Sequence, residues 1–85
     1  MACYSVLIKP SAAKELEAIA RKDRLWIITK IRSLADNPRS SGSEKLSGRE
    51  QYRLRQGRYR IVYSVADPDH TVLVVKIAHR KDVYR

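Results

Sequence analysis

The chain has 85 residues, enough for one small domain with its own core and too few for two. It carries 18 Lys and Arg against 9 Asp and Glu, and this net charge of +9 favours a polyanionic or acidic partner. A single cysteine excludes an internal disulfide, and no apolar run approaches the ~18 residues of a membrane span. We therefore expect residues 1–85 to form one cytoplasmic domain with no membrane partner.

The first half of the chain is predicted to form one strand and two helices. Residues 3–9 are rich in β-branched and aromatic side chains, which indicates a strand that stops at Pro10. Ser11 is placed to cap the helix that follows, and the second helix ends at Pro38. Trp26 is expected to pack in the core, with an interface as the alternative. The apolar residues expected to face the core at helical spacing are Leu16, Ile19, Ala20, Leu25, Ile28, Ile31 and Leu34.

The second half is predicted to form an antiparallel meander. Residues 39–50 are typical of a loop by composition. Three strand-like runs follow, at residues 51–56, 58–66 and 71–78. Gly57 and residues 67–70 mark the two turns between them. The order β-α-α-β-β-β predicts an α+β fold of two layers, in which both helices cover one sheet face and the other face is open.

Arginines are predicted to gather on that open face. Successive strand residues alternate between faces, so Arg53 and Arg55 face away from the core if Leu54 faces it. In the next strand Ile61 belongs to the core-facing set, which places Arg60 on the open side. Guanidinium groups there can bind phosphate oxygens bidentately. The alternative is a merely solvated face, although such a face more often mixes charges of both signs.

The residues after the last strand add cations and an aromatic ring. A tail this short can fold back over the open face, where Tyr84 is available to stack on an unpaired RNA base. The segment supplies His79, Arg80, Lys81, Tyr84 and Arg85. No zinc-ligand spacing, P-loop or nucleophile elbow occurs, so neither a metal nor a cofactor is expected. The residues alone indicate a phosphate-binding surface with RNA as the preferred ligand.

Three segments together resemble the RelE/ParE superfamily of bacterial and archaeal toxins: KLSG at 45–48, YRLRQGRYRIVYSV at 52–65 and VVKIAHRKDVY at 74–84. The order of elements agrees with that family, and the ending HRKDVY is closer to the RelE-like mRNA interferases. By position, the resemblance implies a catalytic site made of Arg53, Arg55, Arg60, Arg80 and Tyr84. The neighbouring side chains assigned to RNA binding are Arg58, His79, Lys81 and Arg85.

The resemblance implies the toxin of a type II toxin–antitoxin system, a metal-independent endoribonuclease that cuts mRNA in the ribosomal A site. The 2′-OH of a nucleotide attacks the adjacent phosphate and leaves a 2′,3′-cyclic phosphate and a free 5′-OH. Arg60 and Arg80 would stabilise the phosphate charge, and Tyr84 would stack on a base or move a proton. The implied partners are mRNA on the ribosome and an acidic, RelB-like antitoxin, whose complex sets the oligomeric state.

One departure from the family pattern leaves the proton acceptor open. The best-known RelE-type site has lysines where this chain has Arg53 and Arg55, and arginine effectively cannot give up a proton. His79 is a candidate proton-transfer group, against a simpler role at a strand end or on a phosphate. Two alternative functions also remain: a ParE-like inhibitor of DNA gyrase, and an RNA-binding homologue without catalysis.

Overall fold

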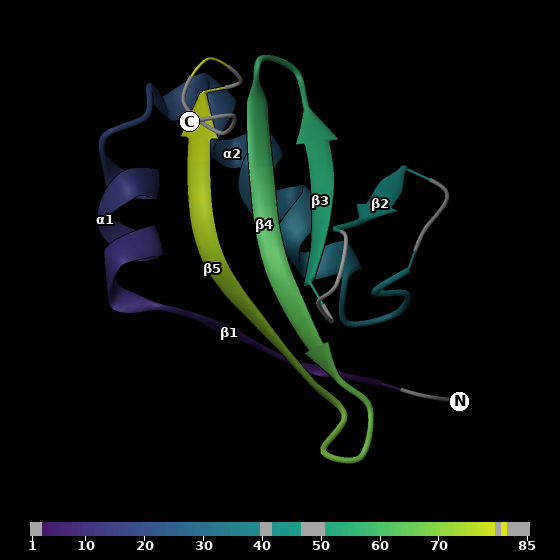
Figure 1. Cartoon of the computed structure of the whole chain (residues 1–85). Helices are drawn as coiled ribbons and strands as arrows, with labels where there is room; N and C mark the ends of the chain where they lie inside the picture. Colours follow the sequence, from purple (N-terminus) through teal and green to yellow (C-terminus); the bar gives the residue numbers. More distant parts are fainter. Residues whose placement is uncertain (1–2, 40–41, 47–50, 80, 82–85) are drawn as a thin grey trace.

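The computed structural model describes residues 3–39, 42–46, 51–79 and 81 of the chain. They form β1 (Ser5–Ile8), α1 (Pro10–Glu17), α2 (Arg21–Ser33), β2 (Ser43–Lys45), β3 (Gln51–Gln56), β4 (Tyr59–Ala66) and β5 (Thr71–His79). The strands make one sheet in the order β1-β5-β4-β3-β2 (Figure 1). β1 is parallel to β5, and the other neighbours are antiparallel. The predicted α+β fold, with its helical pair and antiparallel meander, is confirmed.

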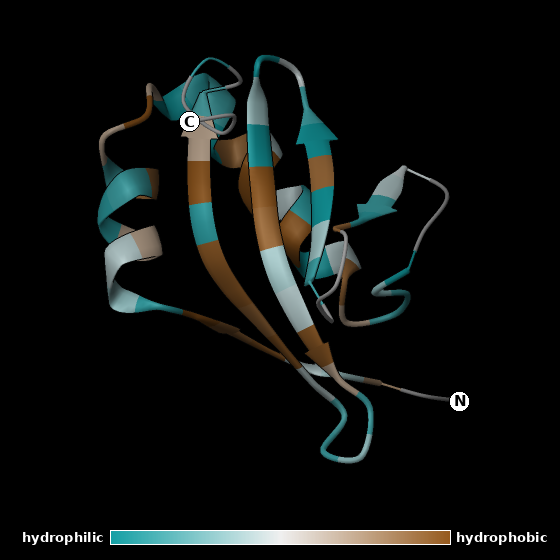
Figure 2. Ribbon diagram, viewed as in Figure 1, coloured by the Kyte–Doolittle hydropathy of each residue, from teal (hydrophilic) through white to brown (hydrophobic). Residues whose placement is uncertain are grey.

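The sheet has a covered face and an open face. α2 crosses behind the sheet in Figure 1, and α1 lies beside the edge of β5. Figure 2 shows hydrophobic residues running through the central strand β4 and its neighbour β5. Within the described ranges, neither helix is long and apolar enough to cross a bilayer.

The predicted loop at 39–50 contains β2, so that prediction is wrong for Ser43–Lys45. This strand pairs antiparallel with β3, where Glu44 lies opposite Arg53 and Lys45 opposite Tyr52. Three polar residues carry no strand pattern of their own. The strand exists because the exposed edge of β3 supplies hydrogen-bond partners, a tertiary effect that overrides local propensity.

The start of α1 also differs from the prediction. Pro10 is the first helical residue, Lys9 is the N-cap, and no side chain caps the helix. Proline suits this position because its φ angle already matches a helix and the first N–H groups of a helix have no intrahelical partner. The capping role expected for Ser11 is therefore wrong.

The buried stripe of α2 is made by Ile27, Ile31 and Leu34, all less than 5% exposed. Leu25 and Trp26, which were expected in the core, are 53% and 57% exposed. A strict spacing of three drifts by about 60° around the helix at every step, because a turn holds about 3.6 residues. Spacings of four and then three return to one face, so the stripe begins at Ile27.

The core fills the space between the helices and the covered face. Its largest fully buried side chain is Tyr63, whose hydroxyl donates a hydrogen bond to the carbonyl oxygen of Pro38 over 2.5 Å. Burial raises the pKa of Tyr63 above its ordinary value. The buried apolar cluster consists of Ala12, Leu16, Ile19, Ile27, Ile31, Leu34, Tyr52, Leu54, Ile61, Tyr63, Val65, Val72, Val74 and Ile77.

A polar cluster ties the segment after α2 to the β4–β5 turn. Arg39 donates to both carboxylate oxygens of Asp67 at 3.0 and 2.7 Å, and its Nε donates to the Tyr52 hydroxyl at 2.8 Å. Tyr4 from the segment before β1 donates its hydroxyl to Asp67 at 2.8 Å. These hydrogen bonds, above all those from Arg39, hold the pKa of Asp67 below its ordinary value. The cluster joins four separate segments of the chain: the residues before β1, those after α2, β3 and the β4–β5 turn.

Candidate functional site

The paired strands β3 and β4 bring the three predicted arginines to one face. Arg55 lies directly opposite Arg60, and Arg53 lies opposite Val62 one row along. The residues that alternate with them, Leu54 and Ile61, pair on the covered face and are at most 2% exposed. The predicted sharing of the open face by Arg53, Arg55 and Arg60 is therefore confirmed.

The three arginines differ sharply in exposure. Arg55 is exposed, whereas Arg60 is only 6% exposed. The Nη1 of Arg60 donates to the carbonyl oxygen of Tyr59 at 3.0 Å and to that of Gly57 at 3.4 Å. Arg60 thus holds the backbone at the β3–β4 turn and, unlike Arg55, is buried. Its part in catalysis stays a prediction.

The turn between β3 and β4 carries another cation. Gly57 adopts a φ of 59°, a left-handed conformation that glycine reaches without steric cost. Arg58 follows it, exposed, at the tip of this two-residue turn. Arg55 and Arg58 have no acidic partner within 4 Å among the described residues. The turn end of the open face therefore holds two accessible positive charges that no described carboxylate neutralises.

The next row along the open face is balanced by acids. It runs across the sheet from Glu44 on β2 through Arg53 and Val62 to Lys76 on β5. Arg53 Nη2 lies 3.2 Å from Glu44 Oε2, and Lys76 Nζ lies 3.2 Å from Oε2 of Glu15 on α1. Each cation of this row is ion-paired, in contrast to the row at the turn. Neither Glu44 nor Lys76 was singled out from the sequence. Glu44 stands in the segment predicted as a loop, and Lys76 was only one residue of the last predicted strand.

The tyrosines that alternate with the arginines serve the core instead. Tyr52 and Tyr63 stack with ring centroids 5.7 Å apart, and the guanidinium carbon of Arg39 lies 5.4 Å from the Tyr52 ring centre. Tyr59 packs against the edge of the core. The aromatic rings of β3 and β4 are thus unavailable to stack on a nucleic-acid base at the open face.

His79 lies on the other side of the sheet from the arginines. It pairs with Tyr59 while Ala78 pairs with Arg60, so the alternation of β5 turns His79 toward the covered side. Its ring meets the Tyr59 ring edge-on at 5.7 Å, and Nδ1 accepts a hydrogen bond from the Lys81 backbone N–H at 3.3 Å. The roles in RNA binding assigned to His79 and to the exposed Lys81 stay predictions, and the placement of His79 favours a strand-end role.

The remaining predicted site residues, Arg80, Tyr84 and Arg85, lie outside the described residues. β5 ends one residue beyond Ala78, the cross-strand neighbour of Arg60. The last described strand therefore finishes at the same end of the sheet as the accessible Arg55. No group of three His, Cys, Asp or Glu within the described ranges is arranged to hold a metal ion.

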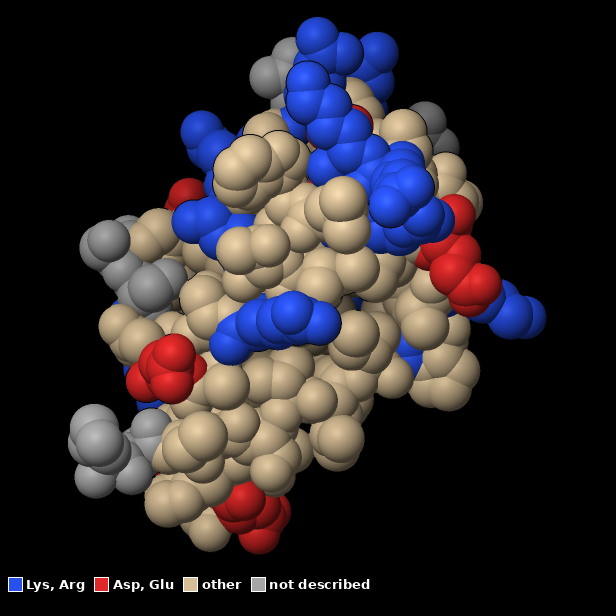
Figure 3. All heavy atoms as spheres, turned by 180° about the vertical axis from the view of Figure 1, so that it is seen from behind, with Lys and Arg blue, Asp and Glu red and all other residues tan. Residues whose placement is uncertain are grey.

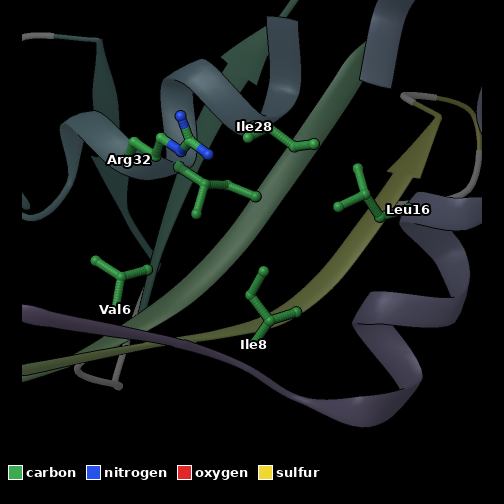
Figure 4. Close-up of a pocket in the computed structure, with 6 residues that line it drawn as sticks. Val6, Ile8, Leu16, Ile28 and Arg32 are labelled. Carbon is green, nitrogen blue, oxygen red and sulfur yellow. The ribbon is translucent and has the colours of Figure 1, made fainter. Parts of the chain in front are cut away.

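The helix side of the molecule carries a separate apolar groove of about 330 Å³. Side chains from β1, α1 and α2 surround it, with Arg32 beside its apolar lining (Figure 4). Its lining residues are Val6, Ile8, Leu16, Ile28, Ile31 and Arg32. Viewed from behind, Lys and Arg gather at one end of this side, and much of the middle is uncharged (Figure 3).

Comparison with known proteins finds matches over nearly the whole chain. The family model described as the ParE toxin of the type II toxin–antitoxin system parDE matches residues 6–84. The toxin RelE of Mycobacterium tuberculosis strain H37Rv is 31% identical over 84 residues, spanning 96% of this chain and 87% of that protein.

Solved structures share the fold. The RelBE2 toxin–antitoxin complex of Mycobacterium tuberculosis matches with a TM-score of 0.84 at 22% identity, over 96% of this chain and 97% of the other. The archaeal RelE–RelB complex of Pyrococcus horikoshii OT3 matches with a TM-score of 0.79 at 25% identity, over 98% and 100%. The match over nearly the full length, to both the family model and the relative, shows that this chain belongs to the RelE/ParE family of type II toxin–antitoxin toxins.

Proposed function

We propose that this protein is a RelE-like endoribonuclease toxin that cleaves mRNA in the ribosomal A site by attack of a 2′-OH on the adjacent phosphate. The observation that carries the proposal is the turn end of the open face, where Arg55 and Arg58 are exposed without an acidic partner among the described residues. Exposed guanidinium groups suit the negative charge that grows on the phosphate in the transition state.

Each arginine then has a distinct task. Arg55 contacts the scissile phosphate, and Arg58 at the turn contacts a neighbouring one. Arg60 supports them from below, since its hydrogen bonds to Tyr59 and Gly57 fix the turn that presents the other two. Arg80 and Tyr84 keep the phosphate-binding and stacking roles that the family resemblance implies.

An acidic antitoxin is the second part of the proposal. The archaeal relative is known in a RelE–RelB complex. A net charge of +9 favours an acidic partner, and the apolar groove with Arg32 beside it suits an amphipathic segment that carries carboxylates. We infer that such a RelB-like chain neutralises the toxin.

The test uses translating ribosomes on a defined mRNA, purified toxin and mapping of the new 5′ ends by primer extension. We expect wild-type toxin to cut within the A-site codon, and both Arg55→Ala and Tyr84→Ala to lose most of that cleavage. Arg21→Ala replaces an exposed arginine of α2, the helix behind the sheet, and is the matched control that should cut normally. Absence of cuts with folded wild-type protein would reject the nuclease proposal.

The matching family model favours one other candidate, because its description names the ParE toxin. A ParE-like protein would inhibit DNA gyrase, and its arginines would contact protein or DNA. A supercoiling assay with purified gyrase separates the two functions. Inhibition of gyrase together with intact mRNA on ribosomes would replace the nuclease proposal by this one.

A further inference from the structure

Glu44 places a carboxylate on the arginine face. It is the middle residue of β2 and lies opposite Arg53 in the register with β3. Its Oε2 is 3.2 Å from Arg53 Nη2, with 63% of the Glu44 side chain exposed against 17% for Arg53. The carboxylate is therefore fixed by an ion pair and still open to solvent from the side on which RNA would approach.

This carboxylate stands next to the proposed phosphate site. Arg53 and Arg55 are two residues apart on β3, a separation of about 7 Å along a strand. Glu44 faces Arg53, so one row of the sheet carries a carboxylate and the adjacent row carries the accessible guanidinium of Arg55. In RNA the 2′-OH and the phosphate that it attacks belong to neighbouring positions of the backbone. The carboxylate of one row can therefore face the 2′-OH while the guanidinium of the adjacent row contacts the phosphate.

Among the residues that the structure describes, the other candidates for proton transfer on this face are poor. Arginine stays protonated, which excludes Arg53 and Arg55 as bases. His79 lies on the covered side of the sheet. Glu15 has both oxygens engaged, one by Lys76 Nζ at 3.2 Å and the other by the backbone N–H of Ile77 at 3.0 Å. Glu44 uses only Oε2 in its ion pair with Arg53, which leaves Oε1 for a substrate hydroxyl.

We propose that Glu44 is the proton acceptor of the cleavage reaction and that Arg53 holds its carboxylate in place. This assignment rests on the proposed nuclease function. The Glu44 carboxylate takes the proton of the 2′-OH as that oxygen bonds to phosphorus, and the bond between phosphorus and the 5′ oxygen breaks. The departing 5′ oxygen takes a proton from water, and the resulting hydroxide removes the proton from Glu44.

The surroundings of Glu44 predict how its role depends on pH. β2 is the edge strand, so within the described part of the chain the charged groups that face the carboxylate come from β3, namely Arg53 and, one row further, Arg55. Lys45 points to the other face of the sheet. Both facing groups are arginines that keep their charge, so neither of them is expected to contribute to the pH dependence of the rate.

The experiment compares wild type with Glu44→Gln in the ribosomal cleavage assay, under single-turnover conditions and across a range of pH. We expect Glu44→Gln to lower the cleavage rate by about 100-fold or more, in line with the 10²–10⁴-fold typical of general-base catalysis. Binding of a single-stranded RNA should be unchanged or tighter, because the substitution removes a negative charge from the face on which RNA would bind. The wild-type rate should fall at acid pH, and the variant should lack that decline.

Glu15→Gln is the matched control, since it neutralises another glutamate paired over 3.2 Å and should leave the rate unchanged. Circular dichroism and thermal unfolding check that both variants fold. A Glu44→Gln rate close to wild type would overturn the assignment while the nuclease function stands. An equal loss at every pH would also overturn it, because Glu44 would then only orient Arg53. Wild-type protein without cleavage would reject the proposed function and this assignment together.

Discussion

Arg55 and Arg60 face each other across two strands, yet one is exposed and the other is buried. The exposed Arg55 is available to contact a ligand, whereas the buried Arg60 contacts the protein's own backbone. Arg55 has no described hydrogen-bond or acidic partner to lose. Arg60 holds two carbonyl oxygens at the β3–β4 turn. The same substitution at the two positions should therefore have different consequences.

Arg55→Ala is expected to weaken RNA binding without loss of stability. Removal of one phosphate contact should lower the slope of log K against log salt by about 0.7 for a single strand. Fluorescence anisotropy with a labelled single-stranded RNA at several salt concentrations measures this slope. An unchanged slope, with Arg21→Ala as the reference, would show that Arg55 contacts no phosphate.

Arg60→Ala is expected to lower both stability and activity. Loss of the guanidinium leaves the Gly57 and Tyr59 carbonyl oxygens without this donor, and a hydrogen bond to a charged group contributes about 1.5–3 kcal/mol. Urea denaturation gives the change in the free energy of unfolding. Stability equal to that of Arg55→Ala would mean that the bracing of the turn contributes nothing.

α2 shows how one helix divides its apolar residues between the core and the surface. Ile27→Ala should destabilise the fold by about 2–5 kcal/mol, because this side chain is fully buried and its removal leaves a cavity. Trp26→Ala should cost less than about 1 kcal/mol in spite of the larger side chain, since more than half of it faces solvent. Chemical denaturation of the two variants compares them directly, and equal costs would contradict the burial pattern.

The polar cluster at the β4–β5 turn should make stability depend on acid. Arg39 and Tyr4 hold the pKa of Asp67 below its unfolded-state value, so the stabilisation is complete above the ordinary range for aspartate and is lost as pH falls through the folded-state pKa. Asp67→Asn should therefore reduce the loss of stability that follows as pH falls below about 4. Thermal unfolding at several pH values measures it, and an identical acid profile would exclude Asp67 as a source.

The whole molecule carries a net charge of +9 on 85 residues, and like charges on so small a body repel one another. Salt shortens the Debye length from about 30 Å at 0.01 M to about 8 Å at 0.15 M. We therefore expect the melting temperature to rise over this range of sodium chloride. A fall would mean that the ion pairs of Arg39, Arg53 and Lys76 outweigh the repulsion.

Much of this fold can be predicted from the sequence because the signals for its strands and turns are local. The hairpin turn at Gly57 and the alternation of Leu54 with Arg53 and Arg55 predict the strands and their faces. β2 gives no such signal, since three polar residues become a strand only where the edge of β3 is free. Glu44 went unnoticed for the same reason.

The exposure of a side chain was harder to predict than the face of the sheet to which it points. Alternation along β4 assigns Arg60 to the open face correctly, but only the three-dimensional turn shows that its guanidinium folds back on two carbonyl oxygens. In α2, a spacing of three placed Leu25 in the core, and Trp26 was assigned there as a large aromatic side chain. The buried stripe instead follows the 3.6-residue turn through Ile27 and Ile31, which leaves Leu25 and Trp26 outside.

The parallel pairing of β1 with β5 has a consequence for how the chain is made. Ser5 pairs with Thr71 and Ile8 with Val74, so β1 cannot pair within the sheet until β5 has been synthesised. β5 also lies between β1 and β4, which means that the sheet stays in two pieces until this strand arrives. Contacts so distant in sequence form slowly. A nascent chain would therefore complete its sheet only after β5 has been translated, and until then β1 lacks the neighbour with which it pairs.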